Sequence, residues 1–205
     1  MRRNLITSRW AALCGIIGPA IFAIDLTALT IAQYGFMINI GWHPLTDPAN
    51  AWPSGLALGP YGALQDASFA VSGSLLAVFA IGLHRGLRGR SKAGPALLFV
   101  SGAAMSLLAF ETDPIDRTGP RSPHGLIHDA SFVLFVAALL LALLYLSLRM
   151  RGDSRWRTHS HYTLGTALGA SACLLLGGPA YYLFIAGTLL WFELTAVKLA
   201  SSPRT

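Results

Sequence analysis

Long apolar runs separated by short polar segments make up most of this chain. A helix needs about 20 apolar residues to cross the roughly 30 Å hydrocarbon core of a bilayer. Six apolar runs approach or exceed that length, over residues 10–34, 62–83, 93–110, 125–148, 162–176 and 180–200. The pattern predicts an all-α fold, namely an integral membrane bundle of six transmembrane helices that forms a single domain over residues 1–205.

Two of the predicted helices carry small residues at helical spacing. Gly102 and Ser106 lie one turn apart in the third run, and Gly165 and Gly169 form a G-x-x-x-G pattern in the fifth. Small side chains let two helix backbones approach each other closely. We therefore expect a tight helix contact at each of these two places.

The composition agrees with a membrane protein. Only 12% of the 205 residues are charged and 54% are hydrophobic, and the mean hydropathy is +0.55. A soluble domain has about a quarter of its residues charged. The two cysteines, Cys14 and Cys173, fall within apolar runs, where a thiol behaves as a small hydrophobic group. They support neither a disulfide framework nor a cysteine-based metal motif.

The basic residues indicate how the helices are oriented. The net charge is +6, but the Lys and Arg residues form short clusters at the ends of apolar runs and no basic face, which argues against a nucleic-acid partner. If the N-terminus is inside, all of the 15 basic residues except Arg117 and Arg121 fall on the inner side. The positive-inside rule then predicts a multi-pass protein of the plasma membrane with both termini cytoplasmic.

The acidic residues gather on the opposite, outer side. Residues 110–129, between the third and fourth runs, combine acids, histidines and arginines. Asp25 and Asp66 lie within or at the outer ends of apolar helices, where an ionised carboxylate is costly unless it faces the bundle interior or a partner. We therefore predict an outward-facing polar site. Its catalytic candidates are His124, His128, Asp66 and Asp113, and its ligand-binding candidates are Asp25, Glu111 and Asp129.

His124 and His128 give this site its most specific feature. They are four residues apart at the start of a predicted helix, so their side chains share one face. Two such imidazoles can bind a divalent metal such as zinc, with Glu111, Asp113 or Asp66 as a third ligand and a water as the fourth. Alternatively, one histidine is a general base and a buried acid is the general acid, without a metal.

Several functions are compatible with these residues. The first hypothesis is that the site binds a lipid or another hydrophobic small molecule at the outer leaflet, with or without turnover by hydrolysis or acid–base chemistry. The second is a non-catalytic scaffold or complex subunit, in which the same residues form a hydrogen-bonded lid. A small transporter is the third. Membrane lipids are the expected partners in each case.

Parts of the sequence resemble a bacterial membrane family catalogued as domain of unknown function 998. The resemblance lies in His43-Pro44, in Leu58-Gly59-Pro60-Tyr61-Gly62, in Phe110-Glu111-Thr112-Asp113-Pro114 and in His124-Gly125-Leu126-Ile127-His128-Asp129. It implies a six-span protein with an outer polar site and supplies no activity. Trp52-Pro53-Ser54-Gly55 stands where that family usually has an Ile-Ser-Asp-type element, so a role for that acid does not carry over.

Overall fold

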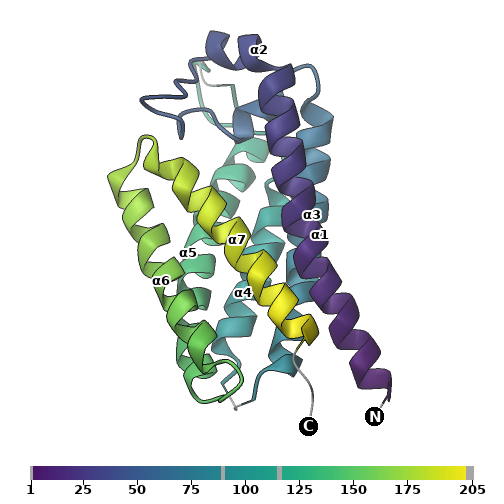
Figure 1. Ribbon diagram of the computed structural model, residues 1–205. Coiled ribbons are helices and arrows are strands. Elements are labelled where there is room, and N and C mark those ends of the chain that lie inside the picture. The colour runs from purple at the N-terminus through teal and green to yellow at the C-terminus, as the bar shows by residue number, and fades with distance from the viewer. Residues whose placement is uncertain (1, 89–90, 115–116, 202–205) are drawn as a thin grey trace.

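The computed structural model describes residues 2–88, 91–114 and 117–201, with side chains from residue 9 onward. The regular structure of these residues is helical (Figure 1). Its elements are α1 (Arg2–Ala32), α2 (Tyr34–Asn39), the 3-10 helix η1 (Ser54–Leu58), α3 (Gly62–Gly86), α4 (Ala93–Leu107), α5 (Pro123–Arg151), α6 (Arg157–Leu176) and α7 (Ala180–Ser201).

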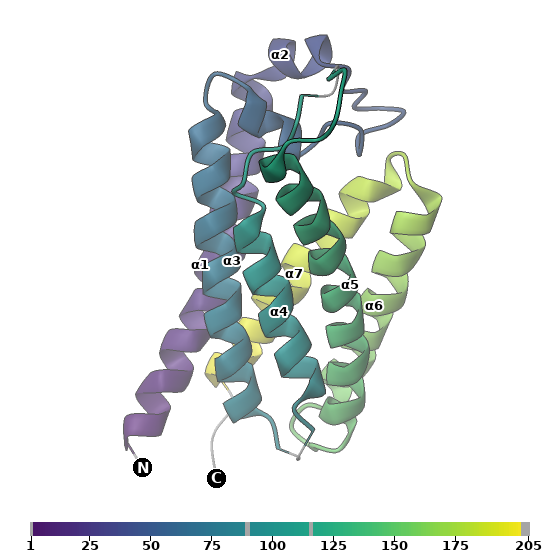
Figure 2. The same cartoon turned by 180° about the vertical axis from the view of Figure 1, so that it is seen from behind.

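The long helices form one bundle in which neighbours along the chain are mostly neighbours in space. α1 packs on α3, α3 on α4, α4 on α5, α5 on α6, and α7 on both α6 and α1. α7 crosses the bundle diagonally from the α6 side to the α1 side (Figure 1). α2, η1 and their loops cover one end of the bundle together with the segment before α5 (Figures 1 and 2). We call residues 33–61, 108–114 and 117–122 the cap.

The start of α1 and the end of α7 lie together at the end of the bundle opposite to the cap (Figures 1 and 2). The basic clusters that end α3 and α5 are also there. Arg117 and Arg121 lie in the cap instead. The predicted segregation of basic residues is therefore a segregation between the two ends of the bundle, although Arg90 and Arg204 lie outside the described residues.

The all-helical membrane architecture is confirmed, and the number of crossings remains a prediction. Among the described residues, four helices are long and apolar enough to cross a membrane: Arg9–Ala32, Gly62–Gly86, Pro123–Arg151 and Ala180–Ser201. α4 is apolar but has only 15 residues and ends before the predicted residue 110. α6 begins five residues before the predicted boundary, and its first turns are polar.

Glycines show where the bundle is most tightly packed. A Cβ on Gly102 of α4 would lie 2.6 Å from the backbone nitrogen of Ala77, and one on Gly73 of α3 would lie 2.6 Å from the Gly102 carbonyl oxygen. The predicted close contact of the third helix is thus confirmed. The close contact predicted for Gly165 and Gly169 is wrong, because a Cβ added to either glycine would have no described atom beyond its own helix within 4 Å.

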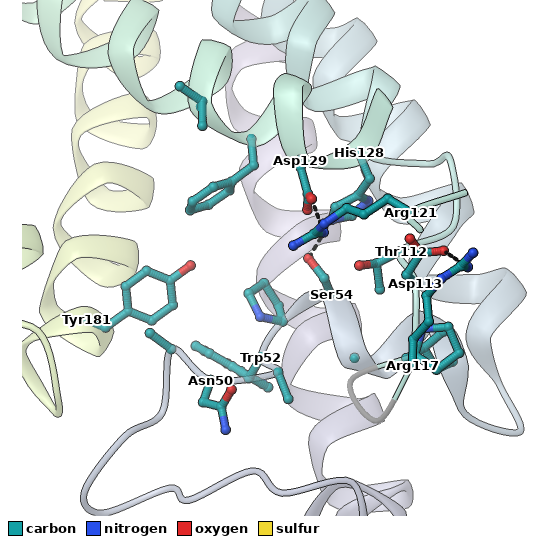
Figure 3. A pocket seen from close by; sticks show the side chains of 18 of the residues that line it. Asn50, Trp52, Ser54, Thr112, Asp113, Arg117, Arg121, His128, Asp129 and Tyr181 are labelled. Atoms are coloured by element: carbon teal, nitrogen blue, oxygen red, sulfur yellow. Dashed lines mark hydrogen bonds and ion pairs between the residues drawn. The ribbon is translucent and has the colours of Figure 1, made fainter. Parts of the chain in front are cut away.

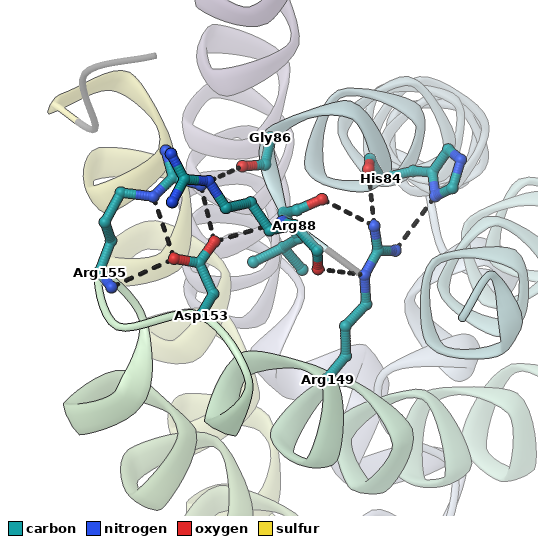
Figure 4. Close-up of polar contacts among 7 residues, drawn as sticks. His84, Gly86, Arg88, Arg149, Asp153 and Arg155 are labelled. Atoms are coloured by element: carbon teal, nitrogen blue, oxygen red, sulfur yellow. Dashed lines mark hydrogen bonds and ion pairs between the residues drawn. The ribbon is translucent and has the colours of Figure 1, made fainter. Parts of the chain in front are cut away.

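Buried polar side chains hold together the end of the bundle opposite to the cap (Figure 4). The Arg149 guanidinium donates to the carbonyl oxygens of Leu87 at 2.8 Å, His84 at 3.1 Å and Arg88 at 3.2 Å. These carbonyls lie at the C-terminal end of α3, where a helix leaves its last carbonyls without intrahelical partners. Arg149 of α5 therefore caps α3.

Asp153 holds the turn that follows α5. Its carboxylate accepts hydrogen bonds from the Arg155 side chain, at 2.6 Å from Nη2, and from the backbone nitrogen of Arg88 at 3.2 Å. Only 1% of the Asp153 surface is exposed. The turn between α5 and α6 is thereby fixed to the end of α3.

Candidate functional site

Side-chain hydrogen bonds hold the cap together and join it to α1. Gln33 donates from Nε2 to the Leu56 carbonyl oxygen at 3.2 Å, and its Oε1 accepts from the backbone nitrogen of Tyr61 at 3.1 Å. The Trp52 indole N–H donates to Thr30 Oγ1 at 2.9 Å. These bonds anchor both sides of η1, and they fix the position of Ser54 at its first residue.

The N-terminal end of α5 binds the carboxylate of Asp113, which lies in the Glu-Thr-Asp-Pro segment before the helix. Ser122 caps the helix by accepting a hydrogen bond from the Gly125 nitrogen at 2.9 Å. Asp113 accepts from the Ser122 nitrogen at 3.0 Å and from the Arg117 guanidinium at 2.7 Å. The hydrogen bond from the Ser122 side chain, then that from its backbone and the nearby arginine charges, hold the pKa of Asp113 below 3.8 despite partial burial.

Gly125 is needed because the Asp113 carboxylate occupies the space of its missing side chain. A Cβ on Gly125 would lie 2.5 Å from Asp113 Cγ, well inside van der Waals contact. The Asp113 carboxylate also lies at the N-terminal end of α5, where the helix dipole favours negative charge. Asp113 and Gly125, which are far apart in the segment, therefore form one structural unit.

We predict that Gly125→Ala displaces the Asp113 carboxylate and destabilises the cap. Overpacking of this kind costs about 1–3 kcal/mol, so the thermal unfolding temperature in detergent should fall by several degrees. Gly187→Ala on α7 is the matched control, because no described atom beyond its own helix lies within 4 Å of its added methyl group. Equal unfolding temperatures for the two variants would contradict the role given to Gly125.

His128 lies at the centre of the site and is 3% exposed. Its Nδ1 is 3.0 Å from the Leu108 carbonyl oxygen and 2.8 Å from that of Phe110, at the end of α4. Its Nε2 is 2.8 Å from Ser54 Oγ of η1. One imidazole therefore links α5, the end of α4 and the cap.

A cavity of about 620 Å³ opens beside His128, between the cap and the ends of α5 and α7 (Figure 3). Two ion pairs lie on its wall: Arg117 with Asp113, and Arg121 with Asp129. Trp52, Pro53 and Tyr181 supply apolar and aromatic surface. The charged groups balance one another, so the wall presents both donors and acceptors rather than a single sign of charge.

An apolar crevice continues from this cavity into the bundle. It is narrow, about 50 Å³, and its walls come from α1, α3, α4, α5 and α7. Four residues line both spaces: Pro53, Ser54, Phe132 and Tyr181. Deeper in the bundle the crevice is lined mainly by phenylalanine, leucine and isoleucine. A polar space and an apolar space therefore meet at Ser54.

The predicted site residues fall into three groups. Asp113, His128 and Asp129 line the cavity. Asp66 lies close enough to Glu111 and His128 for their charges to act on its carboxyl group. The remaining two, Asp25 and His124, lie apart from the cavity.

Asp25 faces the contact between α1 and α3. Its carboxyl group lies near Ser68 of α3, and its Oδ2 is buried without a hydrogen-bond partner among the described residues. The polar side-chain atoms of Gln65 and Ser72 on α3 are also buried and have no hydrogen-bond partner among the described residues. Buried polar groups without a hydrogen-bond partner among the described residues thus lie on both α1 and α3 beneath the cap.

His124 does not join His128. It is exposed, and its ring lies 5.7 Å from that of Phe110. Within the residues that the structure describes, no three His, Cys, Asp or Glu side chains gather as a metal site, and both ring nitrogens of His128 have partners. A metal held by His124 and His128 stays a prediction, which elemental analysis of the purified protein tests.

Ser54 is the site residue that the sequence did not indicate. It precedes His128 by 74 residues and lies in a segment rich in Pro, Gly and Trp, without helical periodicity. Its only sequence signal was its place within the element that departs from the family pattern. The structure gives it a histidine partner and a place on both cavity walls.

Comparison with known protein families agrees with these motifs. The family described as protein of unknown function (DUF998) matches residues 26–199, which is most of the chain. The chain belongs to the DUF998 family. The matched region of this DUF998 protein includes the cap, the cavity and both ion pairs. The chain matches none of the curated proteins and none of the solved structures with which it was compared.

Proposed function

We propose that this DUF998 protein binds an amphiphilic molecule, a lipid or another hydrophobic small molecule, with its polar group in the cavity and its apolar part in the crevice. The observation that supports this proposal is the shared wall of the two spaces, at Pro53, Ser54, Phe132 and Tyr181. Ligand sites are typically apolar clefts with a few well-placed polar groups. The narrow crevice admits a chain only if the helices that line it separate slightly.

The membrane placement is part of this proposal. α1, α3, α4, α5, α6 and α7 cross the plasma membrane, the cap faces outward, and both termini are cytoplasmic. The basic residues at the uncapped end support this orientation, because cytoplasmic segments carry an excess of Lys and Arg. The cavity then opens at the outer leaflet, where a lipid has its polar group.

Labelling of single cysteines tests the orientation. Thr118→Cys in the cap and Arg151→Cys at the end of α5 are both exposed positions, and each is made with Cys14 and Cys173 replaced by alanine. A membrane-impermeant maleimide added to intact cells should label the Thr118→Cys protein and should label the Arg151→Cys protein only after the membrane is opened. The reverse pattern would show that the cap faces the cytoplasm.

Co-purified lipid tests the binding. The protein is purified from membranes in a mild detergent, and bound lipids are identified by mass spectrometry. We expect Arg121→Ala, which removes the ion pair with Asp129, to lose a specific lipid several-fold. Arg151→Ala, also exposed but at the far end of the molecule, should keep it. Equal retention by both variants would show that the lipid binds elsewhere.

A structural lid is the second candidate. The three hydrogen-bonded contacts of His128, to Leu108, Phe110 and Ser54, favour it because they join three separate elements. In a scaffold, His128→Ala lowers the thermal stability in detergent and removes no ligand. In a binding site, the same variant loses the ligand at temperatures where it remains folded.

A further inference from the structure

The contacts of His128 fix where its protons lie. The carbonyl oxygens of Leu108 and Phe110 can only accept, so Nδ1, at 3.0 Å and 2.8 Å from them, carries a hydrogen. In the neutral ring this leaves the lone pair on Nε2. Ser54 Oγ is 2.8 Å from that nitrogen, so its hydroxyl group donates to it. A serine that donates to an oriented imidazole is the arrangement that activates serine as a nucleophile.

The groups around this pair suit the same chemistry. Asp66 lies close enough to His128 for its carboxyl group to interact electrostatically with the imidazole. The Arg121 guanidinium, which pairs with Asp129, lines the same cavity as Ser54 and His128 (Figure 3). Its N–H groups are hydrogen-bond donors that can meet negative charge on the polar group of a ligand in that cavity.

Ser54 is also placed where a ligand would pass. It is half-buried and lines both the polar cavity and the apolar crevice. A molecule with its polar group in the first space and its chain in the second has the link between them next to the Ser54 hydroxyl. In ester-linked amphiphiles that link is a carboxylic ester. Nearby, Ala51 has a φ of 70°, a strained conformation for a residue with a Cβ, in the loop that leads to Ser54.

We propose that Ser54 is a nucleophile and His128 its general base, and that together they hydrolyse a carboxylic ester of an amphiphile. This inference rests on the proposed binding function. It assigns the chemistry of acyl transfer to a serine that neither the sequence pattern nor the family description indicates.

The reaction balances with water as the only co-reactant. Ser54 Oγ bonds to the ester carbonyl carbon while its proton passes to His128 Nε2. The carbon–oxygen bond to the alcohol then breaks, and the alcohol leaves with the proton from Nε2. Water attacks the acyl-serine, gives one proton to Nε2, and releases the carboxylic acid as Ser54 recovers its proton.

The test uses the full chain in detergent micelles and a fluorophosphonate with a long alkyl chain, which bonds covalently to activated serines. We expect the wild-type protein to be labelled at Ser54, as identified by mass spectrometry of its peptide, and Ser54→Ala to take up no label. Ser68→Ala, another serine buried near the cap, should be labelled like the wild type. His128→Gln keeps hydrogen-bonding groups but not the base, and it should be labelled about 100-fold more slowly.

Hydrolysis of p-nitrophenyl esters of increasing chain length by the same proteins gives the second readout. Loss of hydrolysis in Ser54→Ala, with its unfolding temperature and its co-purified lipid unchanged, supports the nucleophile. A folded wild-type protein that keeps its lipid but is not labelled at Ser54 overturns the catalytic proposal and leaves the binding function standing. Labelling at Ser54 in a protein that retains no lipid and is indifferent to chain length overturns the amphiphile as substrate.

Discussion

Replacing Arg149 with alanine should lower the free energy of unfolding by about 3 kcal/mol, because each buried acceptor that loses its donor costs about 1–3 kcal/mol. Arg149 is 8% exposed, and its guanidinium holds the carbonyls of His84, Leu87 and Arg88. Alanine removes the guanidinium donor from the buried Leu87 carbonyl and from the carbonyls of His84 and Arg88. It also removes positive charge from the C-terminal end of α3, where the helix dipole favours it.

Two further variants separate this role from a general effect of charge. Arg151→Ala removes a basic residue two positions away that is exposed, and it should change stability by less than about 0.5 kcal/mol. Arg149→Lys keeps the charge, but an ammonium group lacks the planar guanidinium that reaches three carbonyls. Its stability should therefore lie between those of the wild type and Arg149→Ala. Thermal unfolding in detergent ranks the three. A wild-type unfolding temperature for Arg149→Ala would show that α3 is capped in another way.

Acid should weaken the same end of the molecule through Asp153. The hydrogen bond from the Arg155 side chain, followed by backbone hydrogen bonds from Arg88 and Arg155, lowers the pKa of Asp153 from 3.8 to about 2. Because the folded-state value is the lower one, the carboxylate stabilises the fold fully above pH 3.8. That contribution is lost progressively as the pH falls toward 2. At 1.36 kcal/mol per pKa unit it amounts to about 2 kcal/mol.

The Asp153→Asn variant isolates this effect from other acids. Asp113 has a pKa shifted in the same direction and also weakens the protein in acid, but it does so equally in both proteins. The wild type should therefore be the more stable protein at pH 6, and its advantage over Asp153→Asn should shrink by about 2 kcal/mol on acidification toward pH 2. The measurement is unfolding in detergent across that range. A constant difference would mean that Asp153 is not responsible.

The order of the helices could be predicted because apolar runs of membrane length leave little choice of secondary structure. Their ends were harder. α6 begins at Arg157 because its polar first turns are satisfied: His159 has a partner on α7, and the Ser160 hydroxyl donates to the Arg157 carbonyl oxygen of its own helix. His159 Nε2 lies 2.8 Å from Thr195 Oγ1 on α7, a contact that hydropathy does not reveal. Likewise, Gly102 meets a neighbouring backbone and Gly165 does not, although both lie in similar patterns.

The candidate site was predictable in part for a similar reason. Spacing placed His124 and His128 one turn apart, but α4 ends at Leu107, so only the deeper histidine meets the carbonyls that follow it, those of Leu108 and Phe110. His124 lies beyond that end, against Phe110. Ser54 depends on how an irregular cap folds back over the bundle, and no local pattern encodes that. The basic residues at the end of α5 predicted how the helices are oriented in the membrane. That the Arg149 side chain points into the bundle was not predictable, because it depends on carbonyls more than 60 residues earlier in the chain.

The glycine contacts also determine how the bundle can deform. With Gly73 and Gly102 at backbone contact, α3 and α4 cannot slide or separate without losing their closest packing. On α7, by contrast, Gly187 faces open space. Thermal motion of the helices should therefore be largest in the α6–α7 hairpin, while α3 and α4 move together as one rigid pair. An apolar ligand that enters laterally from the bilayer would have to displace this hairpin. A crosslink between α7 and α1 should therefore block lateral entry.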